Sequence, residues 1–266
     1  MELGYQGKVV GVTGAASSKG IGFAIARRML QEGANVFICD LKQEAVDAAV
    51  EELSVYGTVK GYAADVSSEE AVEALFDSAM ADFGRLDVFI SNAGIYPQSA
   101  LMDMSVKQWD AVMSVNLRSV FLCAKGAYRC MKEKGGVLIN AASYAAVLGS
   151  AGSGAYAASK SAVHSLTKTL AAELAPYNIR VNGFIPGVIQ TGMTRAVVDA
   201  KGDQLVSQIA LHKLGQPDDV ARAVAFLASD AASYLTGTFI EISGGKLCVQ
   251  NPDYGYQKLE AENGGK

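Results

Sequence analysis

The chain has 266 residues, half of them hydrophobic and 19% charged, so it can bury a large core. The formal net charge of -4 argues against nucleic acid or an anionic membrane as the main partner. Its four cysteines show no C-x-x-C spacing and its two histidines are scattered, so we expect free thiols and no metal site.

Short β-branched runs alternate with helical stretches along the chain, a pattern that predicts βαβ units and a parallel sheet. The expected strands cover residues 8–13, 35–39, 59–63, 86–91, 137–141, 180–185 and 238–242. The expected helices cover residues 20–32, 43–53, 68–83, 105–131 and 156–175. No linker or repeat divides residues 1–266, so we predict one α/β domain with a doubly wound parallel sheet (a Rossmann fold), about seven strands and helices on both faces.

A glycine-rich turn, TGAASSKGIG, follows the first strand and leads into a helix. Glycines in this position let backbone N–H groups approach a pyrophosphate at a helix N-terminus. Asp40 ends the second strand, where an acid can accept hydrogen bonds from an adenosine ribose and repel a 2′-phosphate. Lys19 could attract that phosphate instead, but we interpret it as a solvated loop charge. The pattern therefore predicts NAD, with NADP less favoured.

Tyr156 and Lys160 stand four residues apart, and Ser143 precedes Tyr156 by thirteen positions. Side chains at i and i+4 share one face of a helix, so the ammonium is expected to lower the pKa of the phenol. A tyrosine with a lowered pKa is a usable general acid or base. Such a pair is also common on solvated helix faces, so its surroundings decide between the two interpretations.

Several motifs in their proper order make the chain resemble the short-chain dehydrogenase/reductase family from Lys8 to Gly245. The glycine motif corresponds to Thr13, Gly14, Gly20 and Gly22, with five residues between the first two glycines where the common pattern has three. The family's NNAG is similar to Ser91–Gly94, here SNAG, and its PG motif to Pro186-Gly187. Its catalytic tetrad falls on Asn116, Ser143, Tyr156 and Lys160.

The resemblance implies a role for each member of the tetrad. Tyr156 would be the general acid/base, and Lys160 would lower its pKa and hold the nicotinamide ribose hydroxyls. Ser143 would hydrogen-bond the reacting oxygen, and Asn116 would fix a water linked to Lys160. The expected cofactor contacts are Gly14, Ser17, Ser18, Lys19, Gly20, Ile21, Asp40, Leu41, Asp65, Val66, Asn92, Ala93, Gly94, Tyr156, Lys160, Pro186, Gly187, Val188 and Thr191.

The substrate end is less readable from the sequence. Expected substrate contacts are Ser143, Ala145, Tyr156, Tyr96 and Gly187, and residues 188–215 would form a lid. Arg195, Lys201, His212 and Lys213 in that lid could meet an anionic substrate or be solvated. In the C-terminal tail, residues 246–266, the apolar part 247–256 could pack across a subunit boundary, and residues 259–266 are expected to be disordered. The resemblance implies a homotetramer.

Three functions compete at this stage. The first is NAD-dependent hydride transfer to or from a secondary alcohol or ketone, such as a polyol, sugar, hydroxy acid or hydroxysteroid. The second is NADPH-dependent reduction of 3-oxoacyl carrier-protein thioesters, which Asp40 disfavours and which would want a basic docking patch. The third is a non-catalytic nucleotide-sensing scaffold, which the complete tetrad argues against. No signal-peptide pattern or membrane-length apolar run occurs, so a cytoplasmic location with no membrane partner is expected.

Overall fold

The computed structural model describes residues 3–246 and 249–264 and contains one seven-stranded sheet in which all pairs are parallel. The strand order is β3-β2-β1-β4-β5-β6-β7, the doubly wound arrangement that the sequence predicts. The strands are β1 (Val9–Thr13), β2 (Asn35–Asp40), β3 (Val59–Ala63), β4 (Val88–Ser91), β5 (Gly136–Ala141), β6 (Ile179–Pro186) and β7 (Phe239–Ile242).

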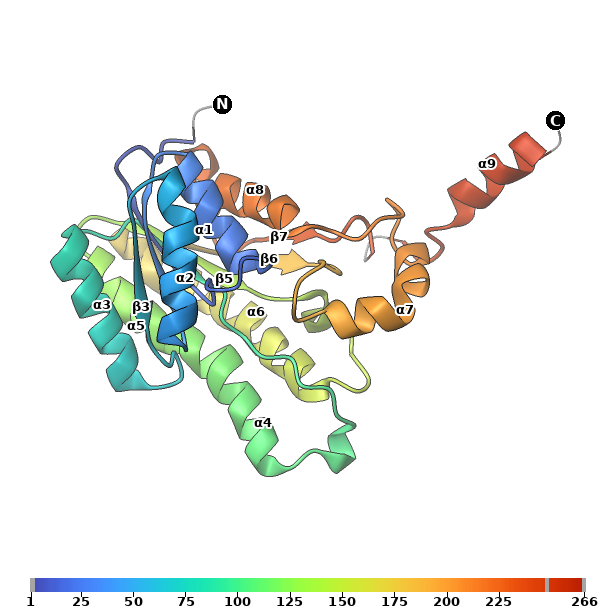
Figure 1. Cartoon of the computed structure of the whole chain (residues 1–266), viewed down its shortest axis with the longest axis horizontal. Coiled ribbons are helices and arrows are strands. Elements are labelled where there is room, and N and C mark those ends of the chain that lie inside the picture. Colours follow the sequence, from blue (N-terminus) through green and yellow to red (C-terminus); the bar gives the residue numbers. More distant parts are fainter. Residues whose placement is uncertain (1–2, 247–248, 265–266) are drawn as a thin grey trace.

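Helices cover both faces of this sheet (Figure 1). One layer contains α1 (Ile21–Gln31), α2 (Gln43–Leu53) and α8 (Pro217–Ala228). The opposite layer contains α3 (Glu69–Phe83), α5 (Ser119–Met131) and α6 (Gly154–Leu174). Helix α3 begins where its sequence predicts, because the Ser68 side chain accepts a hydrogen bond from the Ala71 N–H.

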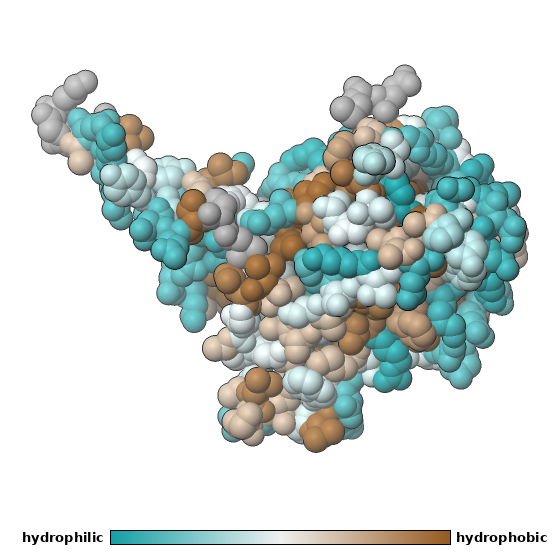
Figure 2. Space-filling model, turned by 180° about the vertical axis from the view of Figure 1, so that it is seen from behind, coloured by the Kyte–Doolittle hydropathy of each residue, from teal (hydrophilic) through white to brown (hydrophobic). Residues whose placement is uncertain are grey.

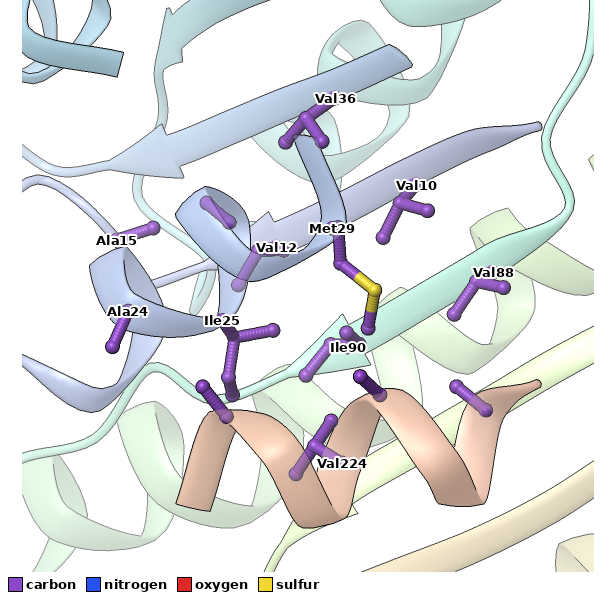
Figure 3. Close-up of a cluster of buried hydrophobic side chains, with 14 of the residues drawn as sticks. Val10, Val12, Ala15, Ala24, Ile25, Met29, Val36, Val88, Ile90 and Val224 are labelled. Atoms are coloured by element: carbon purple, nitrogen blue, oxygen red, sulfur yellow. The ribbon is translucent and has the colours of Figure 1, made fainter. Parts of the chain in front are cut away.

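The two helical layers pack on the sheet through side chains that alternate along each strand. In β1, Val10 and Val12 point to the α1/α8 face, whereas Val9 packs with the α3/α5 cluster. Figure 3 shows the first cluster, with Met29 of α1 and Val224 of α8 reaching toward Val10, Val88 and Ile90. Burial on both faces explains why the inner strands are largely apolar runs. Because all the strands are parallel, their carboxyl ends lie at one edge of the sheet.

The single helix predicted over residues 105–131 is corrected by the structure. It comprises α4 (Val106–Met113), a π-helical turn (Ser114–Arg118) and α5. A π-turn adds one residue to a helical turn, and such bulges are frequent at functional sites. Here the turn contains Asn116, a predicted member of the catalytic tetrad.

The predicted lid contains helix α7 (Arg195–Ser207), which the sequence analysis did not identify. A bridge between Ile189 and Gly215 joins the two ends of this segment. The tail forms α9 (Tyr254–Gly264), so the disorder predicted from residue 259 is wrong as far as residue 264. Leu247 and Cys248, part of the predicted subunit contact, lie outside the described residues.

Helix α9 stands away from the rest of the molecule (Figure 1). Seen from behind, hydrophobic residues gather where this projection joins the body (Figure 2). Among the described residues, no helix is long and apolar enough to cross a membrane.

Candidate active site

The turn after β1 is built for close backbone approach. Gly14 has φ +65, and a Cβ added there would lie 2.7 Å from the Ala93 Cα. A Cβ on Gly22 would lie 2.3 Å from the Gly14 carbonyl oxygen. Helix α1 begins after Gly20 with no side-chain cap, so its first N–H groups remain available to an anion. These features fit the pyrophosphate of a dinucleotide.

Thr13 and Asn92 connect this turn to the end of β4. The Thr13 Oγ1 accepts hydrogen bonds from the Asn92 N–H at 3.0 Å and the Ala93 N–H at 3.1 Å. The Asn92 Nδ2 donates to the carbonyl oxygens of Thr13 and Gly14, both at 3.1 Å. The Asn92 side chain therefore shapes the floor of the crevice at the point where the strand order reverses.

Asp40 is held rigidly at the end of β2. Its Oδ2 accepts the Ala16 N–H at 3.0 Å, and its Oδ1 accepts the Leu41 N–H at 2.8 Å. A carboxylate oxygen has further lone pairs, so Asp40 keeps the capacity to accept ribose hydroxyls. This arrangement fits the ribose contact predicted from its position.

The crevice above these turns is a cleft of about 490 Å³. Most predicted cofactor residues line it, namely Gly14, Ser17, Gly20, Ile21, Asp40, Leu41, Asp65, Val66, Asn92, Ala93, Gly94, Tyr156, Lys160, Pro186 and Thr191. Ser18 and Lys19 instead line a neighbouring hollow that also includes Arg195 of the lid. Gly187 and Val188 line a second cavity on the substrate side.

That second cavity has a volume of about 110 Å³ and shares Tyr156 with the cleft. The predicted substrate residues line it, namely Tyr96, Ser143, Ala145, Tyr156 and Gly187. The Tyr96 ring meets the Tyr156 ring edge-on, with centroids 4.8 Å apart. Leu205 and Val197 of α7 also border the cavity, so the lid forms part of its wall.

Lys160 lies buried beside Tyr156 on α6. Its Nζ donates to the Ala141 carbonyl oxygen at 2.8 Å and lies 5.9 Å from the centroid of the Tyr156 ring. Burial lowers the pKa of Lys160 to about 8. The bond to Ala141 at the end of β5 fixes the ammonium next to the cleft.

The pKa of Tyr156 departs from the sequence prediction. We expected Lys160 to lower it, but burial raises the pKa of Tyr156 to about 12. A hydrogen bond with Ser143 acts in the lowering direction and is the smaller effect. The prediction used the i,i+4 pairing of an exposed helix face, whereas here Lys160 is buried and Tyr156 is half-buried.

Asn116 lies behind the cleft rather than in its wall. Its Oδ1 accepts the Ile95 N–H at 2.8 Å, and its Nδ2 donates to the Ile95 carbonyl oxygen at 3.0 Å and to the Ser159 Oγ at 3.1 Å. Both amide hydrogens are therefore in use. The observed role of the side chain is to hold the segment after β4 against α6, and the predicted water stays a prediction.

Known proteins that resemble this chain in sequence or structure match it along almost its whole length. The sequence model of a family described as "Enoyl-(Acyl carrier protein) reductase" matches residues 14–246. A crystal structure of a short-chain type dehydrogenase/reductase from Mycobacterium marinum superposes with a TM-score of 0.89 and 32% identity, covering 93% of this chain and 98% of that one. The chain belongs to the short-chain dehydrogenase/reductase family.

Curated relatives in this family differ in their printed activities. The chain is 40% identical to the 3-oxoacyl-[acyl-carrier-protein] reductase FabG of Thermotoga maritima, covering 90% of this chain and 98% of the relative. It is 37% identical to a 3alpha-hydroxysteroid dehydrogenase of Mediterraneibacter gnavus, covering 92% and 98%. The chain is thus an oxidoreductase of a family that binds a nicotinamide cofactor.

Some residues of this oxidoreductase site escaped the sequence analysis. Met193 borders both the cleft and the second cavity, and Ile95 and Phe184 line the cleft. Ile95 directly follows the SNAG motif and Phe184 lies in β6, so proximity to a motif or a strand end was an available signal. Met193 carried no such signal, because its position depends on how the lid folds.

Proposed function

We propose that this protein transfers a hydride between NAD and the carbinol or carbonyl carbon of an apolar secondary alcohol or ketone. The supporting observation is that Tyr156 lines both the dinucleotide cleft and the apolar second cavity. Its hydroxyl is thereby available to a substrate oxygen that lies next to the cofactor. When bound, the nicotinamide supplies or accepts the hydride.

The residues of the chain handle the proton and the developing charge. In reduction, the Tyr156 phenol donates a proton to the carbonyl oxygen, and in oxidation its phenolate takes the hydroxyl proton. Ser143, which is hydrogen-bonded to Tyr156, donates to the same substrate oxygen and stabilises its negative charge. Lys160 adds a fixed ammonium beside the phenol while that lysine is protonated.

Asp40 supports NAD over NADP. Its carboxylate is locked by two backbone N–H groups, so it cannot easily turn away from a 2′-phosphate. The nearest compensating candidate in the sequence, Lys19, lines another hollow. A like charge that stays in place disfavours the phosphorylated cofactor.

Reduction of 3-oxoacyl carrier-protein thioesters is the second candidate, and the relatives favour it. FabG from Thermotoga maritima is among the chain's most similar relatives at 40% identity. An acidic carrier protein would be bound by unpaired basic residues. On the outer helices Lys125 pairs with Glu69, and Arg129 pairs with Asp77, which weakens the basic surface there.

A matrix of cofactors and substrates separates the two functions. NAD and NADP are each assayed with neutral secondary alcohols, the matching ketones and a 3-oxoacyl carrier-protein. Our proposal expects at least a tenfold higher kcat/KM with NAD than with NADP, and a shift toward NADP in Asp40→Asn. Turnover by Tyr156→Phe should fall by about 10²–10⁴-fold. A wild-type preference for NADPH with the carrier-protein substrate would replace this proposal by the second candidate.

A further inference from the structure

Lys246 places an ammonium group beside the substrate cavity. It follows the Gly244-Gly245 turn after β7 and is only partly exposed. Its Nζ lies 5.6 Å from the centroid of the Tyr144 ring and donates to the Gln208 Oε1 at 2.8 Å. The pKa of Lys246 is lowered because the ammonium is partly buried and therefore less well hydrated.

The Lys246 ammonium contacts two residues near the second cavity: Tyr144, which lines it, and Gln208, which lies next to a lining residue. Tyr144 lines the cavity and directly follows Ser143, which binds the reacting oxygen. Gln208 directly follows α7, one turn after Leu205, which also lines the cavity. The ammonium therefore lies where the lid helix and Tyr144 meet, at the margin of the substrate space.

The charge of Lys246 has no acidic counterpart in the part of the chain that the structure describes. Its contacts are an amide oxygen and an aromatic ring, both formally neutral. Other lysines of this protein, such as Lys8 and Lys60, form ion pairs with aspartates. The nearest acid in sequence, Glu241 of β7, accepts a hydrogen bond from Ser243. A partly desolvated cation with only neutral contacts is stabilised by an anion that a ligand brings.

We propose that Lys246 binds an anionic group, such as a carboxylate, at the end of the substrate remote from the reacting alcohol or ketone. This inference rests on the proposed function, because it names the substrate class of the same site. The cavity next to the reacting residues is bordered by Leu205, Val197 and Ile189, which suit an apolar body. The substrate class is therefore an apolar hydroxy acid or oxo acid.

The test uses acids and their methyl esters as matched pairs. The pairs are secondary hydroxy fatty acids of increasing length between hydroxyl and carboxylate, and a 3-hydroxysteroid carboxylic acid. Wild-type protein, Lys246→Met and Lys246→Arg are compared, with Lys134→Met as control because Lys134 is an exposed lysine that lines neither cavity. Steady-state KM and kcat are measured for each pair, and Kd is measured by calorimetry without turnover.

We expect the wild type to bind at least one acid about tenfold more tightly than its ester, the strength of a hydrogen bond to a charged group. Lys246→Met should remove that difference by weakening the acid alone, and Lys246→Arg should retain most of it. Lys134→Met should leave it unchanged. Equal effects of Lys246→Met on acid and ester, or no preference for any acid in the wild type, would overturn the proposal.

Failure of the proposed function gives a different pattern. If no alcohol or ketone is turned over with either cofactor, the hydride-transfer proposal fails. A Lys246-dependent difference in Kd between acid and ester would then still support the anion site. Turnover of neutral esters with no role for Lys246 would support the proposed function and overturn the anion site.

Discussion

At the scale of single residues, burial decides how the central tyrosine behaves. Lys160 is buried and Tyr156 is half-buried in the wall of the cleft, so each loses hydration in its charged form. The pKa of the tyrosine rises to about 12 and that of the lysine falls to about 8. In the cofactor-free protein at neutral pH, Tyr156 is thus a proton donor, the form that reduction requires.

The raised pKa of Tyr156 determines how the rates of reduction and oxidation depend on pH. A raised pKa keeps the phenol protonated to higher pH, so reduction should be sustained through neutral pH. Oxidation needs the phenolate, so its kcat/KM should rise with pH and show no plateau near neutrality. Profiles of kcat/KM in both directions, with Ser143→Ala compared at each pH, measure this dependence. A plateau of the oxidation rate near pH 7 would mean that Lys160 and the bound cofactor outweigh burial.

The sequence could predict the identity of the reacting residues but not their electrostatics. Spacing brings Tyr156 and Lys160 onto one turn of α6, and the structure has them there. The depth of burial depends on Ala141 of β5 and on the segment after β4, which are remote in sequence. A Cβ added to Gly94, for instance, would lie 3.6 Å from the Lys160 Nζ.

At the scale of secondary-structure elements, the π-turn joins α4 to α5 and places Asn116 against two other parts of the chain. The turn sequence SVNLR contains no glycine or proline to mark a helix end, so the sequence predicts one continuous helix. Asn116 satisfies both the N–H and the carbonyl of Ile95. These two partly buried groups depend on one side chain.

Asn116→Ala should therefore destabilise the fold as well as the site. Leaving a partly buried donor and acceptor unpaired costs up to about 1–3 kcal/mol for each group. Denaturant unfolding should show a stability loss of at least about 2 kcal/mol. The control Ser159→Ala removes only one partner of the Asn116 amide and should cost less. Equal losses of unfolding free energy in Asn116→Ala and Ser159→Ala would show that the two hydrogen bonds to Ile95 do not stabilise the fold.

The tail and the lid form a second junction between elements. The His212 Nε2 lies 2.6 Å from the Asp253 Oδ1, and the His212 ring stacks on Tyr256 with centroids 3.5 Å apart. The Tyr256 hydroxyl also donates to the Ala210 carbonyl oxygen at 3.1 Å. The sequence analysis considered His212 only as a substrate or solvent contact, because a contact across forty-one positions has no local signature.

Removing the His212 ring should release the tail from the lid. In His212→Ala, limited proteolysis within residues 249–262 should become several times faster, because both the hydrogen bond to Asp253 and the stacking contact with Tyr256 are lost. Lys213→Ala is the matched control, since Lys213 is the exposed neighbour in sequence. Mass spectrometry of the fragments over time gives the rate. Unchanged cleavage would show that the contacts of His212 do not restrain the tail.

At the scale of the whole molecule, the doubly wound sheet was predictable because its inner strands are buried on both faces and read as largely apolar runs, namely β1, β2, β4, β5 and β6. The position of the cleft follows from that topology. Helices α7, α8 and α9 escaped prediction. Weak amphipathic patterns give the reason for α7 and α9, and α7 has no buried residue, whereas α8 buries one apolar face and was missed despite that pattern. Their positions depend on contacts with the body that the local sequence does not encode.

Assembly is the remaining question at this scale. The resemblance to the family predicts a homotetramer that uses the helices near residues 105–131 and 156–175. On that side Trp109 and Phe121 expose 37% and 48% of their surface, more than large aromatic residues of a core would. We expect these rings to lie in a contact between copies of the chain.

Phe121→Glu tests this contact without touching the active site, because Phe121 lines neither cavity. A charge buried at a contact between subunits is costly, so light scattering should show a smaller particle than the wild-type tetramer. Tyr56→Glu is the control, since Tyr56 is 40% exposed and follows α2, in the opposite helical layer. If both variants keep the particle mass of the wild type, Phe121 does not lie in the contact between subunits. A monomeric wild type would contradict the predicted homotetramer.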